Sequence, residues 1–158
     1  MGHVLERSQW LPGAPEDVFG FFADALNLER ITPDWLGFRV LTPGPIVMDA
    51  GTLIEYRLRL HGVPINWLTR IEVWEPPNRF VDAQVRGPYK AWHHTHSFEP
   101  DGGGTLMRDT VGYALPFGPL GEVARRAFVA RDLVRIFDFR REAVEAVIRP
   151  ARRPSAPQ

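Results

Sequence analysis

Apolar residues recur at every second position over several stretches of the chain, the pattern of strands that bury one face. In residues 52–60, Ile54, Tyr56 and Leu58 alternate with charged side chains. The same kind of pattern predicts further strands at 4–11, 38–42, 63–74 and 80–85. The two arms of a hairpin between Gly87 and Tyr113 complete the set, so we expect a sheet of six to seven strands.

Turns between these segments set the expected strand pairing. A tight turn at 61–62 pairs Leu60 with Val63 and places Tyr56 opposite Trp67, so that the apolar positions of both strands share one face.

The turn at Pro76-Pro77-Asn78 leads into the next strand. If Val73 pairs with Phe80 across it, Asp82 and Gln84 join the same face of the sheet.

Helical spacing of apolar residues appears before and after the strands. Pro15 suits the first turn of a helix at 15–26, a second short helix is expected at 26–31, and a long helix runs to about 148. The expected apolar stripe of the long helix is Leu120, Val123, Ala127, Val134, Phe137, Ala143 or Val144, and Val147 or Ile148. Because the helices do not alternate with the strands, the fold class is α+β with an antiparallel sheet.

The hairpin carries an unusual set of polar residues. On its first strand Trp92, His94, His96 and Phe98 share one face, while His93 points the other way. On the return strand the residues that share a face are Met107, Asp109, Val111 and Tyr113. A loop at 100–103 pairs Phe98 with Thr105 and places His94 opposite Asp109. Imidazoles, a carboxylate and a phenol are therefore predicted to face the interior, where polar groups must find partners.

Composition narrows the function. Lys and Arg number 19 and balance 19 Asp and Glu, which disfavours a nucleic-acid binder. The long helix is rich in arginine, and we interpret these residues as a solvated face: Arg125, Arg126, Arg131, Arg135, Arg140 and Arg141.

The chain has no cysteine, which excludes disulfides and thiolate chemistry. We expect no membrane span and no signal peptide, hence a cytoplasmic protein, with one domain at 1–148 and a disordered Pro- and Arg-rich tail at 149–158.

Several motifs resemble the START/polyketide cyclase-dehydrase-like (SRPBCC) superfamily over about residues 3–148, in particular a bacterial subgroup whose motifs define no activity. They are Ala14 to Phe19, Trp67 to Ile71, Glu75 to Asp82, Gly87-Pro88-Tyr89 with Trp92 to Phe98, and Gly104-Thr105 with Asp109 to Pro116. The resemblance implies a helix-grip fold, in which a curved antiparallel sheet wraps around a long C-terminal helix. It also implies a hydrophobic small molecule held in an internal cavity.

The predicted inner face supplies the candidate ligand-contacting residues, from both apolar and polar positions. They are Tyr56, Trp67, Thr69, Gln84, Trp92, His94, His96, Met107, Asp109 and Tyr113. Our first hypothesis is a binding protein for a lipid-, polyketide- or aromatic-like molecule, as a monomer or homodimer without a cofactor. The second is an aromatase/cyclase or dehydratase in which His94 or His96 moves protons, supported by Asp109 or Tyr113. The third is an interaction module that uses the Arg-rich helix.

Metal binding is an alternative for the same residues. His94, His96 and Asp109 could form a two-histidine, one-carboxylate set. The spacing permits such a site without being specific for it, and we expect hydrogen-bonded residues and no native metal.

Overall fold

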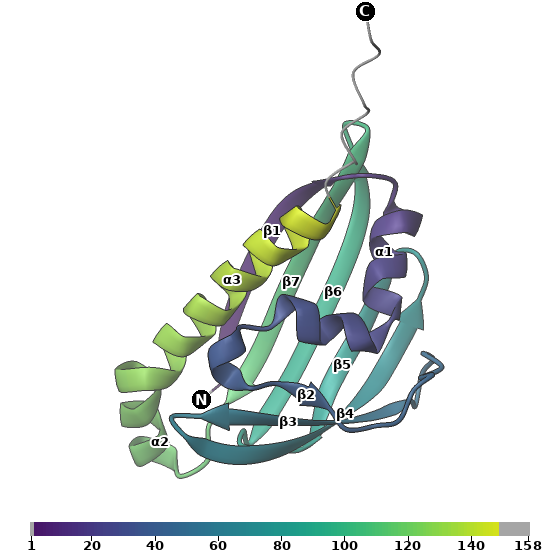
Figure 1. Cartoon of the computed structure of the whole chain (residues 1–158). Helices are drawn as coiled ribbons and strands as arrows, with labels where there is room; N and C mark the ends of the chain where they lie inside the picture. Colours follow the sequence, from purple (N-terminus) through teal and green to yellow (C-terminus); the bar gives the residue numbers. More distant parts are fainter. Residues whose placement is uncertain (1, 149–158) are drawn as a thin grey trace, which may run out of the picture.

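A seven-stranded antiparallel sheet curls around the C-terminal helix α3 (Figure 1) in the computed structural model, which describes residues 2–148. The predicted disordered tail lies outside the described residues. The strand order is β1-β7-β6-β5-β4-β3-β2. The strands are β1 (His3–Pro12), β2 (Arg39–Val40), β3 (Leu53–Leu60), β4 (Val63–Glu75), β5 (Arg79–Arg86), β6 (Ala91–Asp101) and β7 (Gly104–Ala114). The predicted α+β helix-grip architecture is confirmed.

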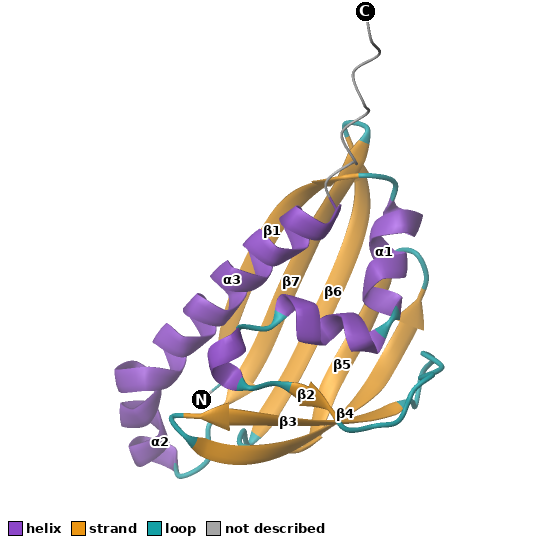
Figure 2. Cartoon of the chain, viewed as in Figure 1, coloured by secondary structure: helices purple, strands orange, loops and turns teal. Residues whose placement is uncertain are grey.

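The helices gather on the concave side of the sheet (Figure 2). They are α1 (Pro15–Ala23), the 3-10 helices η1 (Ala25–Ile31) and η2 (Asp34–Leu36), α2 (Gly118–Ala124), a π-helical turn η3 (Arg125–Val129) and α3 (Ala130–Ile148). Pro15 occupies the first turn of α1, where its missing N–H costs no hydrogen bond. None of the described helices is long and apolar enough to cross a membrane.

The register between β3 and β4 is the predicted one. Leu60 pairs with Val63 and Tyr56 with Trp67 across a turn in which His61 and Gly62 both have positive φ.

The predicted register between β4 and β5 is wrong next to the turn and right beyond it. Trp74, not Val73, pairs with Phe80. An irregularity between Ile71 and Val73 then shifts the register by one residue, so Ile71 faces Asp82 and Thr69 faces Gln84 as predicted.

The predicted register of the β6–β7 hairpin is shifted by two residues. The strands continue to Asp101 and Gly104, and only Gly102 and Gly103 form the loop, with φ of 53° and 81°. Such φ values at both central positions belong to a two-residue turn that glycine adopts without strain. As a result His96, not His94, pairs directly with Asp109. A shift of two residues keeps the same side chains on the inner face.

The apolar stripe predicted along the C-terminal helix is only partly correct. Leu120, Val123 and Val134 are exposed, whereas Leu133, which the stripe omitted, is buried. The π-helical turn η3 inserts a wider turn into the helix, so one 3.6-residue stripe cannot continue through it.

Candidate functional site

A cavity of about 170 Å³ lies between the inner face of the sheet, η1 and α3. Apolar side chains form most of its wall, among them Phe22, Ile31, Phe38, Ile54, Leu58, Leu133 and Phe137. Its volume is slightly above the roughly 150 Å³ of a cavity that admits benzene, and lies below the roughly 300–1,000 Å³ of most drug-sized pockets. The space therefore suits a small, mainly apolar molecule.

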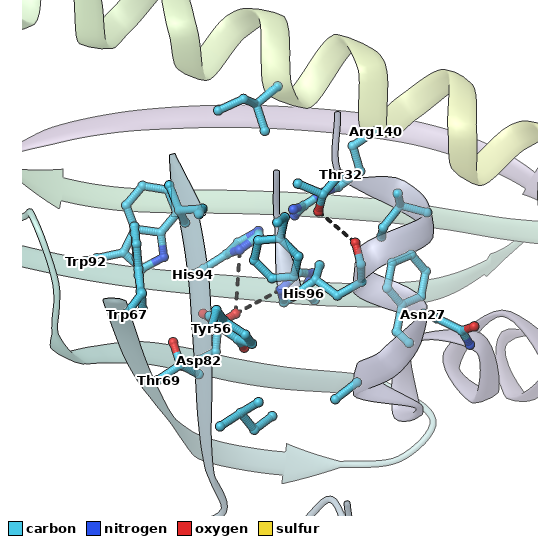
Figure 3. Close-up of a pocket in the computed structure, with 18 of the residues that line it drawn as sticks. Asn27, Thr32, Tyr56, Trp67, Thr69, Asp82, Trp92, His94, His96 and Arg140 are labelled. Atoms are coloured by element: carbon cyan, nitrogen blue, oxygen red, sulfur yellow. Dashed lines mark hydrogen bonds and ion pairs between the residues drawn. The ribbon is translucent and has the colours of Figure 1, made fainter. Parts of the chain in front are cut away.

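Two imidazoles and two carboxylates form a polar cluster, of which Figure 3 shows His94, His96 and Asp82 in the wall of the cavity. Asp109 Oδ1 lies 3.0 Å from His94 Nε2 and 2.8 Å from His96 Nδ1, the second contact at an angle that gives no hydrogen bond. Asp82 Oδ2 lies 3.1 Å from His96 Nε2 and 3.5 Å from His94 Nδ1. Each imidazole is thus placed between two carboxylates.

Strand geometry explains why these residues meet. His94 and His96 are two positions apart on β6, so both point inward, and their ring centroids lie 3.7 Å apart. Asp109 comes from β7 and Asp82 from β5, the strands on either side. Phe80 stacks on the other face of His96, at 4.0 Å and 16° between the planes.

The surroundings move the pKa values of the two imidazoles in opposite directions. Burial and the neighbouring His96 hold the pKa of His94 below its usual value, despite the hydrogen bond to Asp109. Burial also acts to lower the pKa of His96, but Asp109 and Asp82 outweigh it and raise that pKa. The pKa values of two adjacent histidines are therefore moved apart, one below and one above the usual value.

The carboxylates and a phenol of the site are shifted as well. Burial would raise the pKa values of Asp82 and Asp109, but the two histidines hold both below the usual range. Burial, together with the charge of Asp82, raises the pKa of Tyr56, which keeps this phenol neutral. An ionised carboxylate only accepts, so the hydrogen bond at His94 Nε2 is donated by the imidazole to Asp109.

Three of these residues could also hold a metal ion. Ligand atoms of Asp82, His94 and His96 lie within 4.8 Å of one another. Asp109 would then lie behind the imidazoles, the place of a carboxylate that orients metal-binding histidines. The set differs from the predicted one, because Asp82 takes the position that the sequence analysis gave to Asp109.

Most predicted ligand-contacting residues do line the cavity: Tyr56, Trp67, Thr69, Trp92, His94 and His96. Met107 and Asp109 instead line a smaller hollow beside β1. Gln84 exchanges hydrogen bonds with the backbone of Tyr89, and Tyr113 packs in a cluster with Leu133 and Phe137, so neither lies in the cavity wall. The predicted inward direction of Tyr113 is correct, but its place in the polar patch is not.

Asp82 and Arg140 line the cavity although the sequence analysis did not include them among the site residues. Asp82 had been placed on the inner face only if one strand pairing held. Arg140 had been assigned to a solvated helix face, and this is wrong. It follows Leu133 and Phe137 and precedes Val144 at the spacing of one helix face, which was the available signal.

Comparison with solved structures shows the same fold at low sequence identity. CV1439 from Chromobacterium violaceum matches with a TM-score of 0.73 and 15% identity over 94% of this chain and 99% of its own. The Zhui aromatase/cyclase from Streptomyces sp. R1128 matches with a TM-score of 0.72 and 14% sequence identity, and the match covers 94% of each chain. TTHA0849 from Thermus thermophilus matches with a TM-score of 0.69 and 21% sequence identity, over 92% of this chain and 99% of its own. No curated protein sequence matches.

A family model gives the relationship directly. The model described as polyketide cyclase / dehydrase and lipid transport matches residues 11–139, which include all of the cavity wall except Arg140. Together with the helix-grip architecture, this match shows that the chain belongs to the polyketide cyclase/dehydrase and lipid transport family.

Proposed function

We propose that the protein binds a small hydrophobic molecule, lipid-, polyketide- or aromatic-like, in the cavity, with its polar group toward Asp82, His94 and His96. The observation that carries this proposal is a mainly apolar cavity with the hydrogen-bonded group Asp82, His94 and His96 in its wall. Binding sites for small molecules commonly combine apolar walls, which supply affinity, with a few placed polar groups, which orient the ligand. Membership of a cyclase and lipid transport family supports the same class of ligand.

A tryptophan scan of one strand tests this proposal. Leu58 is buried and lines the cavity, whereas Leu53 lies on the same strand β3 and is 51% exposed. We expect the native protein to bind naphthalene at one site in an NMR titration. Leu58→Trp should fill part of the cavity and weaken binding about tenfold or more, while Leu53→Trp should leave it unchanged.

Thermal unfolding of both variants verifies that they fold. Unchanged binding by a folded Leu58→Trp protein would place the ligand elsewhere. Native protein that binds neither naphthalene nor any member of a lipid and polyketide panel would contradict the proposed function.

A second candidate function is proton transfer on the bound molecule, as in an aromatase/cyclase or dehydratase. The favouring observation is the pair His94 and His96, side by side on the cavity wall with pKa values moved apart. Such a pair can act as base and acid in one step. The Zhui aromatase/cyclase shares the fold, which is compatible with this chemistry but does not carry it over.

The catalytic candidate makes its own prediction. Once a substrate is found, His94→Gln should lower kcat about 100-fold, the scale of general acid–base catalysis. Turnover that is unchanged in this variant would end the catalytic interpretation and leave binding in place.

A further inference from the structure

Arg140 brings a positive charge into the cavity from α3. It stands in the inward row Leu133, Phe137, Arg140 and Val144, where its neighbours along the helix are buried core residues. In Figure 3 the arginine extends from α3, while Asp82, His94 and His96 approach the same space from the sheet. A long cationic side chain in such a row would ordinarily turn outward to water, so its inward direction needs a physical reason.

Within residues 2–148 the guanidinium of Arg140 has no carboxylate within 4.0 Å, and its Nε is buried without a hydrogen-bond partner. It does lie over the ring of Phe137, at 5.1 Å from the centroid. Burial lowers the pKa of Arg140, against the attraction of Asp109 and Asp82. Guanidinium groups nevertheless stay charged in proteins, so Arg140 keeps a half-buried charge whose buried Nε has no acceptor among the described residues.

The nearby carboxylates are already engaged. Asp82 and Asp109 each face an imidazole nitrogen of His94 and one of His96, at 2.8 to 3.5 Å. Arg125 in η3 shows the contrast, because it is half-buried as well but pairs with Glu122 at 2.7 Å. The middle of α3 thus presents a planar set of donors to a mainly apolar cavity whose other polar side chains include Asp82, His94 and His96.

We propose that Arg140 binds the carboxylate of the cavity ligand, which makes the preferred ligand a ring-sized or short-chain apolar carboxylic acid. This inference rests on the proposed function and narrows its ligand class. A guanidinium matches a carboxylate in a planar, two-point contact. A singly charged planar group also costs less to desolvate than a phosphate dianion, which suits a small apolar cavity.

Phenylacetate and phenylacetamide test the proposal, because they have nearly the same shape and differ in charge. In NMR titrations of the native protein we expect phenylacetate to bind about tenfold more tightly, on the scale of a charge-assisted hydrogen bond. Arg140→Gln should abolish this preference by weakening phenylacetate alone, and Arg140→Lys should keep part of it. The control is Arg131→Gln, an exposed position on the same helix, which should retain the full preference.

The outcomes separate this inference from the function on which it rests. Equal affinity of the native protein for the acid and the amide overturns the carboxylate site, as does equal weakening of both compounds in Arg140→Gln. If naphthalene binds but neither phenyl compound does, the carboxylate site is wrong and the cavity function stands. If naphthalene also fails to bind, both proposals fall.

Discussion

The two faces of strand β6 hold the same residue type in opposite environments. His93 points outward, its side chain is 56% exposed, and its Nε2 lies 3.3 Å from Glu72. His94 and His96 point inward with side chains 4% and 6% exposed, each between two carboxylates. On the outer face, water weakens the attraction between an imidazolium and a carboxylate. On the buried inner face the effective dielectric constant is lower, so the same attraction is stronger. Strand parity, and not residue identity, therefore decides which imidazoles face the cavity.

The largest effect should come from removing the carboxylate shared by the inner histidines. Asp109→Asn removes one of the two carboxylate charges that His94 and His96 face, and breaking a buried ion pair costs about 3 kcal/mol of unfolding free energy. Glu72→Gln makes the matching change beside the exposed His93 and should cost less than about 1 kcal/mol. Urea unfolding measures both. Equal losses in the two variants would contradict the difference between the faces.

A smaller contrast should separate the histidines themselves. His94→Gln removes a buried hydrogen-bonded ring and should lower the unfolding free energy by about 2 kcal/mol, since Asp109 loses a donor. His93→Gln should stay within about 0.5 kcal/mol of the native protein, as exposed substitutions do. Thermal or urea unfolding provides the comparison. A large loss of unfolding free energy in His93→Gln would show that the outer face also contributes to stability.

The pH dependence of stability should follow His96, whose pKa is raised, and the two carboxylates Asp82 and Asp109. The folded-state pKa of His96 is raised, so its contribution is complete below the usual pKa of about 6.5 and is lost as pH rises through the folded-state pKa. The pKa values of Asp82 and Asp109 are lowered, so their contribution is complete above about 3.9 and is lost as pH falls through the folded-state values.

The free energy of unfolding, measured from pH 6 to 9, tests the contribution of His96. The decline of stability above pH 6.5 should be smaller in His96→Gln and should persist in His93→Gln. Native-like pH dependence in His96→Gln would show that its protonation contributes nothing to folding.

The smallest expected effect concerns metal. The hydrogen bonds of the cluster already join Asp82 to His96 and Asp109 to His94, so we expect no stoichiometric metal and little change of Tm on adding Zn²⁺. Elemental analysis of protein purified without a His-tag measures this. One tightly bound ion per chain, lost in Asp82→Asn but kept in His93→Gln, would contradict this expectation. It would show that the cluster coordinates a metal ion.

The sequence predicted the layers of this fold well, because alternation and helical spacing are direct consequences of burying one face. It also predicted which side of β6 faces inward, since parity survives a register error of two residues. Register itself was harder to predict. Gly102-Gly103-Gly104 allows loops of several lengths, and an irregularity in β4 changes the pairing by one residue without a clear sequence signal.

The partners within the site were only partly predictable. His94, His96 and Asp109 were found because they share a face on two adjacent strands. Asp82 depended on a third strand whose register was uncertain, and Arg140 on a helix whose phase is altered by a π turn. The many arginines of the helix led to the wrong prediction for Arg140, because it was assigned with the others to a solvated face.

Native mass spectrometry of the protein purified from cells tests the cavity proposal most directly. We predict a bound species of small mass that is apolar, stays with the folded protein and dissociates on unfolding. Phenylacetate or naphthalene should displace it from the native protein and bind less well to Leu58→Trp. A bare polypeptide mass, combined with no binding across an apolar ligand panel, would contradict the account of an internal ligand site.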